Sequence, residues 1–384
     1  MLALPTKDPV WIATPLKLQE MVEELSHEPV VAVDTESNSL YAYRERVCLV
    51  QISTPQTDYL VDPLAIDDLS PLALLFADPM RQKIFHAAEY DVICLKRDYS
   101  FEFSNIFDTM IAARILAEPQ VGLGSLLQNY FSIKLDKRFQ RADWGKRPLS
   151  QAMLDYARMD THFLFALKTL LEEKLGEKGL LSLASEDFDL VSATIPSGTE
   201  PNGKSCWKVS GAAHLSPREN AILQSLCAYR DQYARKVNLP HFKVISNELL
   251  VEITRANPAT LDALKAVPGM SAKVFQRHST GLLQAVTTGK TASPPKRERM
   301  HRPDQGVLNR LNALHDWRKE QGKRLQVESD VVLPREFMEK IATANPGNLT
   351  ELHVLMQKVP WRFERYGNAI LAAITRKETH ENII

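Results

Sequence analysis

The rear half of the chain contains one pattern twice, and this internal repeat limits the folds that the chain can adopt. At an offset of 88 residues, Ala256-Asn257-Pro258 coincides with Ala344-Asn345-Pro346. The offset then grows to 92, where Val267-Pro268 coincides with Val359-Pro360, so the second copy has four extra residues. Repeats of this kind arise when one structural unit occurs twice, and each copy is therefore expected to fold in the same way.

Each copy has the residue spacing of short helices. In the first copy, Ile222, Leu223 and Leu226 fall on one helix face, and Asn-Pro and Val-Pro pairs supply turn signals. Each copy spans roughly 75 residues, which is enough for a small helical bundle. We therefore expect two all-α bundles in the rear half.

Two segments without periodicity divide the chain. Residues 191–216 are rich in Ser, Gly, Pro and Thr, and residues 287–306 combine a Pro pair with a Lys/Arg run. A chain of 384 residues is also too long for one ordinary hydrophobic core. The sequence thus predicts three domains, at residues 1–208, 214–290 and 304–380.

The front domain mixes strands and helices. Thr14-Pro15 predicts a helix start, and the β-branched run at 30–36 predicts a strand. Residues 47–53 and 58–62 are separated by a short turn and predict a hairpin. The remaining predicted elements are a helix near 69–77, a strand at 83–86, a helix at 87–97 and a long helix at 150–174. This order indicates an α/β domain with a mixed sheet.

The net charge of zero hides an asymmetry between the two halves. Residues 1–210 hold 21 Lys and Arg against 30 Asp and Glu, a charge of −9. Residues 211–384 carry +9, of which +8 lies in 211–302. An acidic front joined to a basic rear suggests a metal-binding or catalytic part tethered to a part that binds polyanions. The alternative is an uneven surface charge without a ligand.

Targeting signals and cysteine spacing point to the cytoplasm. No apolar run reaches the roughly 18 residues needed to span a bilayer, and the first residues lack the basic start of a secretory signal. The four cysteines are scattered, without a C-x-x-C pair, so neither a disulfide scaffold nor a structural zinc site is expected.

Two carboxylates lie together at the end of a strand that should be buried. Because strand side chains alternate, Asp34 and Glu36 share one face with Val30 and Ala32. Close like charges repel unless a cation lies between them, and a divalent metal ion is the simplest such cation. The alternative is that the strand ends here and both acids point to water.

A third acid interrupts an apolar helix face. Asp160 is the only charged residue on a stripe that includes Met153, Tyr156, Phe163 and Leu167. A carboxylate in that position requires a cation or strong hydrogen-bond donors. The alternative is a salt bridge to a neighbouring Arg. Asp91, in the first turns of an earlier helix, completes the series, although an acid at a helix start is ordinarily a cap.

These motifs together resemble the ribonuclease D family, within the tyrosine branch of the DEDD superfamily of 3′→5′ exonucleases. The motifs are Asp34-Thr35-Glu36, the segment from His86 to Asp91, and Tyr156-Ala157-Arg158-Met159-Asp160. The loop 135–150 is similar to that family's approach to its third motif. The two rear repeats resemble HRDC modules, helical nucleic-acid-binding domains named for helicases and RNase D.

The resemblance implies a fold and a mechanism. The fold would be an α/β ribonuclease H-like exonuclease domain with a mixed sheet, followed by two all-α HRDC helical bundles. Two divalent ions, Mg²⁺ or Mn²⁺, would be held by Asp34, Glu36, Asp91 and Asp160, with Asp34 bridging them. Tyr156 would be a neutral hydroxyl that orients the attacking water. His86 and His162 are expected to be structural.

The implied substrate is the 3′ end of tRNA precursors and other stable RNAs, released one nucleoside 5′-monophosphate at a time. Candidate RNA contacts lie in the loop before the last motif, at Lys137, Arg138, Arg141, Trp144, Lys146 and Arg147. Alternatively, this loop is solvated and Trp144 lies in the core. The first HRDC module and the basic run 296–302 are stronger candidates for RNA binding than the less basic second module.

Two other functions stay open on the sequence. A DNA 3′→5′ exonuclease would use the same acids, because metal-binding carboxylates do not distinguish the sugar. A catalytically inert RNA-binding adaptor would keep the fold without the reaction. In either case we expect a monomer that does not act at a membrane.

Overall fold

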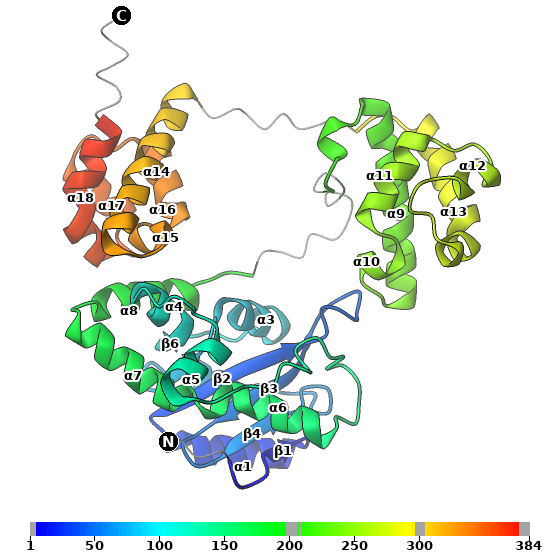
Figure 1. Cartoon of the computed structure of the whole chain (residues 1–384). Helices are drawn as coiled ribbons and strands as arrows, with labels where there is room; N and C mark the ends of the chain where they lie inside the picture. The colour runs from blue at the N-terminus through cyan, green and yellow to red at the C-terminus, as the bar shows by residue number, and fades with distance from the viewer. Residues whose placement is uncertain (1–4, 197–205, 207–208, 296–303, 376–384) are drawn as a thin grey trace, which may run out of the picture. The chain divides into compact units, whose positions relative to one another are not determined.

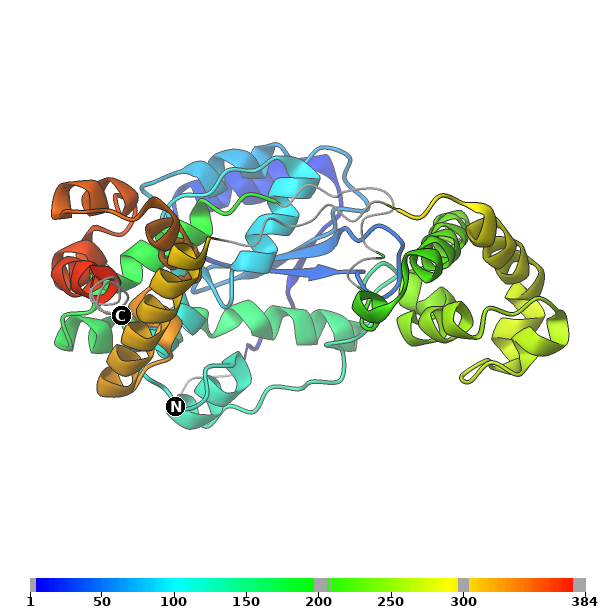
Figure 2. The same ribbon diagram turned by 90° about the horizontal axis from the view of Figure 1, so that it is seen from above.

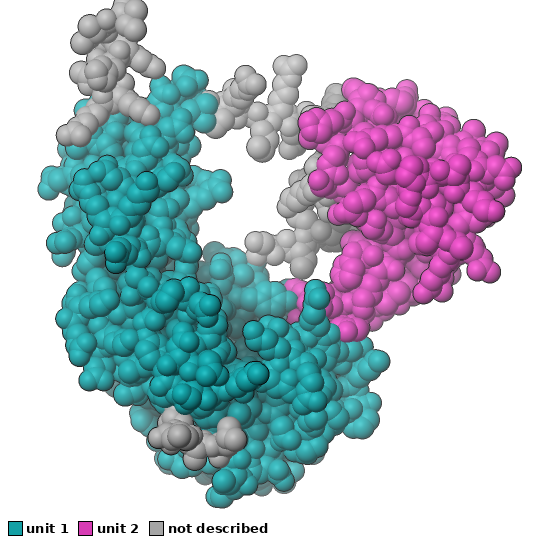
Figure 3. Space-filling view, in the orientation of Figure 1, with its two compact units in different colours: residues 1–36, 47–196, 301–384 teal, residues 37–46, 197–300 magenta. Residues whose placement is uncertain are grey.

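The chain forms two compact units in the computed structural model, which describes residues 5–196, 206, 209–295 and 304–375 (Figure 1). The first unit contains residues 1–36, 47–196 and 301–384, and the second contains residues 37–46 and 197–300 (Figure 3). The second helical repeat therefore belongs to the same compact unit as the front domain, whereas the first repeat forms a unit of its own.

A six-stranded mixed sheet is the centre of the front domain. Its strand order is β1-β4-β3-β2-β5-β6. β1 pairs with β4 in parallel, β3 pairs with β4 in antiparallel fashion, and β2, β5 and β6 run parallel. The strands are β1 Val10–Ile12, β2 Val30–Ser37, β3 Val47–Ser53, β4 Asp58–Val61, β5 Gln82–Phe85 and β6 Ile106–Asp108.

Helices cover both faces of this sheet (Figure 2). The alternation along β2 shows how: Val31 and Val33 pack into one cluster with α1, while Ala32 packs into another with α7. The helices of the front domain are α1 Pro15–Ser26, α2 Pro71–Ala77, α3 Glu89–Tyr99, α4 Thr109–Ile115, α5 Leu123–Phe131, α6 Gln151–His162, α7 Leu164–Glu177 and α8 Leu181–Ser192.

Several predicted elements are confirmed and one is wrong. The hairpin of β3 and β4 is present, and α1 begins after Thr14, whose side chain accepts a hydrogen bond from the Lys17 backbone. The long helix predicted at 150–174 is instead two helices, because the chain breaks at Phe163 between α6 and α7. The apolar stripe continues through that break, so periodicity alone could not reveal it.

The first three helices of one repeat correspond in length to the first three helices of the other. The first repeat contains α9 Pro217–Val237, α10 His241–Val244, α11 Asn247–Ala256, α12 Leu261–Lys265 and α13 Ala272–Thr291. The second contains α14 Gln305–Leu325, α15 Ser329–Val332, α16 Arg335–Ala344, α17 Leu349–Leu355 and α18 Pro360–Thr375. The lengths of these first helices agree at 21, 4 and 10 residues. Asn257 and Asn345 end corresponding helices in left-handed conformations, which confirms the repeat.

Two features of the second unit were not predicted. Cys206 and Cys227 form a disulfide, which the expectation from cysteine spacing missed, while Cys48 and Cys94 are buried and form no disulfide. Residues 37–46 also pack in this unit, where the Tyr43 hydroxyl donates a hydrogen bond to Asp231 at 2.6 Å. The basic run 296–302 lies outside the described residues.

The helices of the structure can be compared with the sequence prediction that no apolar run is long enough to span a bilayer. Among the residues that the structure describes, no helix combines the length and apolar character that crossing a membrane requires.

Candidate active site

Strand β2 directs its side chains alternately to the two faces of the sheet, and this places the first two acids. Asp34 and Glu36 continue the row of Ala32, which packs with α7. Thr35 continues the row of Val31 and Val33, on the opposite face. Asp34 and Glu36 are only partly buried, so a ligand can reach them from this end of the strand.

The acids from three separate elements influence one another electrostatically. Burial raises the pKa of Asp34 well above its usual value, and the charge of Asp160 raises it further. Burial also raises the pKa of Asp91, with Asp34 as the next cause. Burial followed by the charges of Asp34, Asp160 and Asp91 raises the pKa of Glu36 to about 10. The structure thus brings the four predicted acids into one site.

Asp160 reaches this site from helix α6, which packs on β3 and β4. Burial and the charge of Asp91 raise the pKa of Asp160 to about 7. Among the described residues, no Lys or Arg side chain forms an ion pair with any of the four acids. The alternative of a salt bridge between Asp160 and an Arg is therefore wrong.

The donor set suits a hard divalent cation in its chemistry. Partly buried carboxylates with raised pKa values and no positive partner are stabilised by a metal ion more than by any other neighbour. In the part of the chain that the structure describes, however, no three His, Cys, Asp or Glu side chains already stand as a metal-binding group. A cation would have to draw these carboxylates together.

Tyr156 lies on the same face of α6, one turn before Asp160. Burial, followed by the charges of Asp160, Glu36 and Asp34, raises its pKa above the ordinary value for tyrosine. The hydroxyl therefore keeps its proton at neutral pH. The ring is held by aromatic contacts, at 5.9 Å from Phe139 and 6.0 Å from Trp144 between ring centroids.

Two polar residues that the sequence did not single out hold these acids. The Thr35 hydroxyl donates a hydrogen bond to Asp91 Oδ1 at 2.5 Å, which links β2 to α3. The fully buried Gln51 donates from Nε2 to Asp34 Oδ2 at 3.4 Å, and its Oε1 atom has no hydrogen-bond partner. The sequence offered only their positions as a sign of this role, since Thr35 lies in the acid-bearing strand β2 and Gln51 in the neighbouring strand β3.

A further acid positions the start of α3. Asp108 accepts hydrogen bonds from the backbone N–H groups of Ala87 and Ala88, at 3.1 and 2.7 Å. Ala87 has a positive φ of 64°, an unfavourable conformation for a residue with a side chain, and the hydrogen bond to Asp108 stabilises it there. Asp91 lies in the first turn of this helix, so Asp108 helps to set its position.

The two histidines have structural partners. His86 Nδ1 is 2.9 Å from the Thr109 hydroxyl, and burial lowers the pKa of His86 to about 4. His162 Nδ1 is 3.1 Å from Asp58. Both positions agree with the structural roles expected from the sequence.

Two of the six candidate RNA contacts need correction. Trp144 is 1% exposed and packs with Leu49 and Ala157, so it cannot stack on a base, and the alternative of a core tryptophan holds. Arg147 is held by Asp62 at 2.6 Å and by the carbonyl oxygens of Cys48 and Trp144. Its guanidinium group is therefore bound by Asp62 and by backbone carbonyl oxygens, and is not offered to a phosphate.

The other four candidates stay at the surface of the loop. Lys137, Arg138, Arg141 and Lys146 are all exposed, and Arg138 forms an ion pair with Asp136 at 2.7 Å. Asp136 also contributes to the raised pKa of Tyr156. The exposed part of this loop thus lies near Tyr156.

Comparison with protein families identifies the class that this fold and site define. Residues 9–176 match the 3′-5′ exonuclease family model, and residues 219–286 and 307–374 each match the HRDC domain. A 3′→5′ exonuclease domain joined to two HRDC domains is therefore the architecture of this chain.

Individual relatives narrow the class. A ribonuclease D from Gluconacetobacter diazotrophicus is 33% identical over 286 residues, covering 74% of this chain and 72% of the relative. The catalytic core of RRP6 from Trypanosoma brucei superposes with a TM-score of 0.67 at 27% identity, covering 75% of this chain and 81% of that one. RNase D of Escherichia coli, at 24% identity, shows the same fold with a TM-score of 0.67, over 92% of this chain and all of that one. The chain belongs to the ribonuclease D family of 3′→5′ exoribonucleases.

Proposed function

We propose that this exoribonuclease trims the 3′ ends of tRNA precursors and other stable RNAs by two-metal-ion hydrolysis. The observation that carries the proposal is the group of four acids, Asp34, Glu36, Asp91 and Asp160, coupled to one another without a cationic partner among the described residues. Buried acids without such partners are typical of functional sites.

The carboxylates of Asp34, Glu36, Asp91 and Asp160 would together hold two divalent cations, Mg²⁺ or Mn²⁺. When bound, such ions supply a nucleophile at neutral pH and neutralise charge on the phosphate and the leaving oxygen. Thr35 and Gln51 would keep Asp91 and Asp34 in orientation through their hydrogen bonds.

Tyr156 would orient the attacking water and would not act as a base. Its raised pKa supports this, because a hydroxyl that keeps its proton can donate a hydrogen bond but cannot accept a proton at neutral pH. The contacts with Phe139 and Trp144 hold the ring in place, which preserves the direction of that hydrogen bond.

The RNA would be gripped at two places. Near the site, the exposed residues Lys137, Arg138, Arg141 and Lys146 would contact phosphates of the 3′ end, and single nucleoside 5′-monophosphates would leave. Farther along the RNA, the first HRDC module would supply sequence-independent, salt-sensitive binding, together with the run 296–302.

The proposal extends to the organisation of the whole chain. Domain limits of 1–208, 214–290 and 304–380 are supported by the three family matches, which fall inside them. A monomer acting in the cytoplasm, where tRNA precursors are found, completes the proposal.

Degradation of matched RNA and DNA tests this function. Purified protein is incubated with 3′-tailed RNA or DNA of the same sequence, in Mg²⁺, Mn²⁺ or EDTA, beside an Asp160→Asn variant. We expect stepwise shortening of the RNA from its 3′ end, release of nucleoside 5′-monophosphates, and no shortening in EDTA or by the variant. Equal shortening of DNA would favour a DNA exonuclease, and no shortening under any condition would favour an inert adaptor.

A further inference from the structure

The two HRDC modules differ at the turn before their last helix. In the numbering of the repeat, Val267-Pro268 corresponds to Val359-Pro360, so Gly269 and Met270 correspond to Trp361 and Arg362. Gly269 has a φ of 82°, a conformation that glycine adopts easily. In the second module the final helix α18 begins directly at Pro360, and its first turn carries the tryptophan and the arginine.

Arg362 is completely buried, at 0% exposure, and contacts the front domain. Its Nη1 atom lies 2.9 Å from Glu186 Oε2, and its Nη2 atom lies 2.8 Å from Asp187 Oδ1. Nη2 also donates to the carbonyl oxygen of Val331 at 2.9 Å, within the second module. A buried arginine shared between two carboxylates of α8 therefore joins the module to the exonuclease domain.

The front domain also caps the final helix of the second module. Glu186 Oε1 accepts hydrogen bonds from the backbone N–H groups of Trp361 and Arg362, in the first turn of α18. These are N–H groups that a helix cannot satisfy within itself. In the first module the corresponding helix α13 is capped by Ser271, a residue of the same module. The second module thus depends on the exonuclease domain for an interaction that the first module makes alone.

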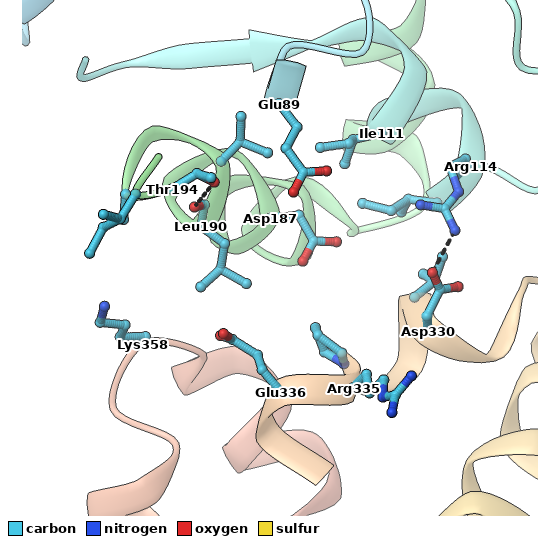
Figure 4. Close-up of a pocket in the computed structure, with 16 residues that line it drawn as sticks. Glu89, Ile111, Arg114, Asp187, Leu190, Thr194, Asp330, Arg335, Glu336 and Lys358 are labelled. Carbon is cyan, nitrogen blue, oxygen red and sulfur yellow. Dashed lines mark hydrogen bonds and ion pairs between the residues drawn. The ribbon is translucent and has the colours of Figure 1, made fainter. Parts of the chain in front are cut away.

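Further ion pairs surround this contact. Arg114 of α4 lies 2.7 Å from both Glu328 and Asp330 at the start of α15. Between these ion pairs is a cavity of about 600 Å³, lined by residues of α8 on one side and of α15 and α16 on the other (Figure 4). The module is therefore held by these polar contacts together with apolar packing, since Val331 belongs to the same hydrophobic cluster as Leu183 of α8, and Trp361 packs against that cluster.

The second module carries far less net positive charge than the first, since residues 303–384 carry +1 and residues 211–302 carry +8, although its exposed Lys319, Lys323 and Lys358 form no ion pair among the described residues. Arg324, Arg335 and Lys340 pair with acids one turn away, Glu320, Glu339 and Glu336. In the first module, the exposed Lys265, Lys273 and Arg277 form no ion pair within the described residues. Unpaired cations attract a polyanion, whereas paired cations do so weakly.

We propose that the second HRDC module is a structural support of the exonuclease domain, docked on α8 through Arg362, and is not an RNA-binding module. This proposal goes beyond the proposed function, because it assigns a structural role to a module that takes no part in the reaction. Only its second part, on RNA binding, rests on the proposed substrate.

The support extends toward the acids through packed elements. Phe188 of α8 contacts Phe107 of β6, with ring centroids 4.8 Å apart. The next residue along β6, Asp108, holds the backbone of Ala87 and Ala88 before α3, the helix of Asp91. A module that steadies α8 therefore steadies an element two contacts away from a catalytic carboxylate.

Hydrogen exchange of the full chain, without metal or RNA, tests the docking. Arg362→Ala is compared with Arg365→Ala, which removes an exposed arginine from the same helix. We expect at least tenfold faster exchange in α8 and in the first turn of α18 for Arg362→Ala, and wild-type exchange for the control. Glu186→Gln, which keeps the shape but removes the charge, should accelerate the same two segments to a smaller extent. Unchanged exchange in both variants would overturn the docking role.

Binding of RNA in EDTA, where cleavage is excluded, tests the second part. Three cations are replaced by Gln in each module: Lys265, Lys273 and Arg277 in the first, and the exposed Lys319, Lys323 and Lys358 in the second. At low salt we expect the first set to weaken binding by roughly tenfold or more and the second by less than roughly twofold. Equal weakening by both sets would overturn the proposal, and a failure of the exonuclease assay would leave either result standing.

Discussion

Helix α6 contributes side chains to two buried sites that contain carboxylates. The two sites differ in whether a cation lies beside the carboxylate. In the first, Asp58 accepts hydrogen bonds from Ser53 and His162 and forms an ion pair with Arg158 at 2.5 Å. In the second, Asp160 faces other acids and no cation among the described residues. Arg158 and Asp160 are two residues apart, so the same helix completes one group and leaves the other without a positive charge.

The pKa values of the two groups move in opposite directions. Burial alone would raise the pKa of Asp58, but hydrogen bonds from His162, Ser53 and Arg158 lower it below the usual value. Burial and Asp91 raise the pKa of Asp160 instead, to about 7. A satisfied acid contributes to the fold, whereas an unsatisfied one requires a ligand. This difference is why we assign the catalytic role to the second group.

Replacing Asp160 by Asn is expected to have the largest effect on activity. Loss of one metal-binding carboxylate should lower RNA hydrolysis on the order of 10³-fold, equivalent to about 4 kcal/mol of transition-state stabilisation. The same change removes an acid that burial disfavours, so the metal-free variant should unfold at a higher temperature than the wild type. Single-turnover assays and calorimetry measure the two effects. A variant that is active and less stable would contradict the assignment.

Replacing Asp58 by Asn should show the opposite result. Arg158 would remain buried without its ionised partner, and breaking such a pair costs about 3 kcal/mol of stability. Urea unfolding measures the loss. Enzyme that remains folded should keep most of its activity at saturating Mg²⁺, because Asp58 does not face the metal-binding acids. A stability equal to that of the wild type would show that the ion pair is not structural.

The pH dependence of stability separates the two groups without mutation. Up to about pH 7 the folded protein keeps the proton on Asp160, because its pKa is raised to about 7. Glu36, with its pKa raised to about 10, keeps its proton over the whole range from pH 5 to 8, whereas the unfolded chain has already lost both protons. Stability must then fall with rising pH in this range, by roughly 2 kcal/mol from Asp160 alone in the metal-free protein, with a further decline from Glu36. Asp58, whose pKa is lowered, stabilises the folded protein throughout this range, and its contribution is lost only at more acidic pH.

Urea unfolding at several pH values checks this expectation, with Asp160→Asn as the control that should make the decline less steep below about pH 7. Saturating Mg²⁺ should remove the decline as well, because the cation binds the ionised acids. A metal-free protein whose stability rises from pH 5 to 8 would contradict the raised pKa.

The smallest expected effect is that of Tyr156→Phe. The variant keeps the ring and its contacts with Phe139 and Trp144 and loses only the hydroxyl. Turnover should fall roughly tenfold, the effect of imperfect orientation, while metal binding stays unchanged. Steady-state kinetics and metal titration measure the two quantities, and loss of bound metal would contradict a role in orienting water.

Local patterns revealed much of this fold and of the candidate site. The strand at β2, the hairpin of β3 and β4, and the repeat all follow from residue spacing within a short segment. Asp34, Glu36 and Asp160 could be named because strand alternation and helix periodicity place them on buried faces, whereas Asp91 could be named only from the order of the motifs. The three motifs also occur in the same order as in a known family, and this resemblance supported the choice of residues.

Contacts between distant segments could not be predicted in this way. Gln51 resembles any polar residue in a strand until β3 lies beside β2 and the amide reaches Asp34. Trp144 and Arg147 looked like RNA contacts because they lie in a basic loop, but they are anchored by β3 and β4 residues far along the chain. The docking role of Arg362 depends on α8, about half the chain away.

A titration of the metal-free protein with Mn²⁺, followed by the electron paramagnetic resonance signal of free Mn²⁺, tests the central claim most directly. Wild-type protein and the Asp58→Asn variant should each bind two ions, while Asp34→Asn should bind fewer and more weakly, because it lacks one of the four carboxylates. Equal binding by wild type and Asp34→Asn, or no binding by the wild type, would contradict the assignment of the four acids as the metal site.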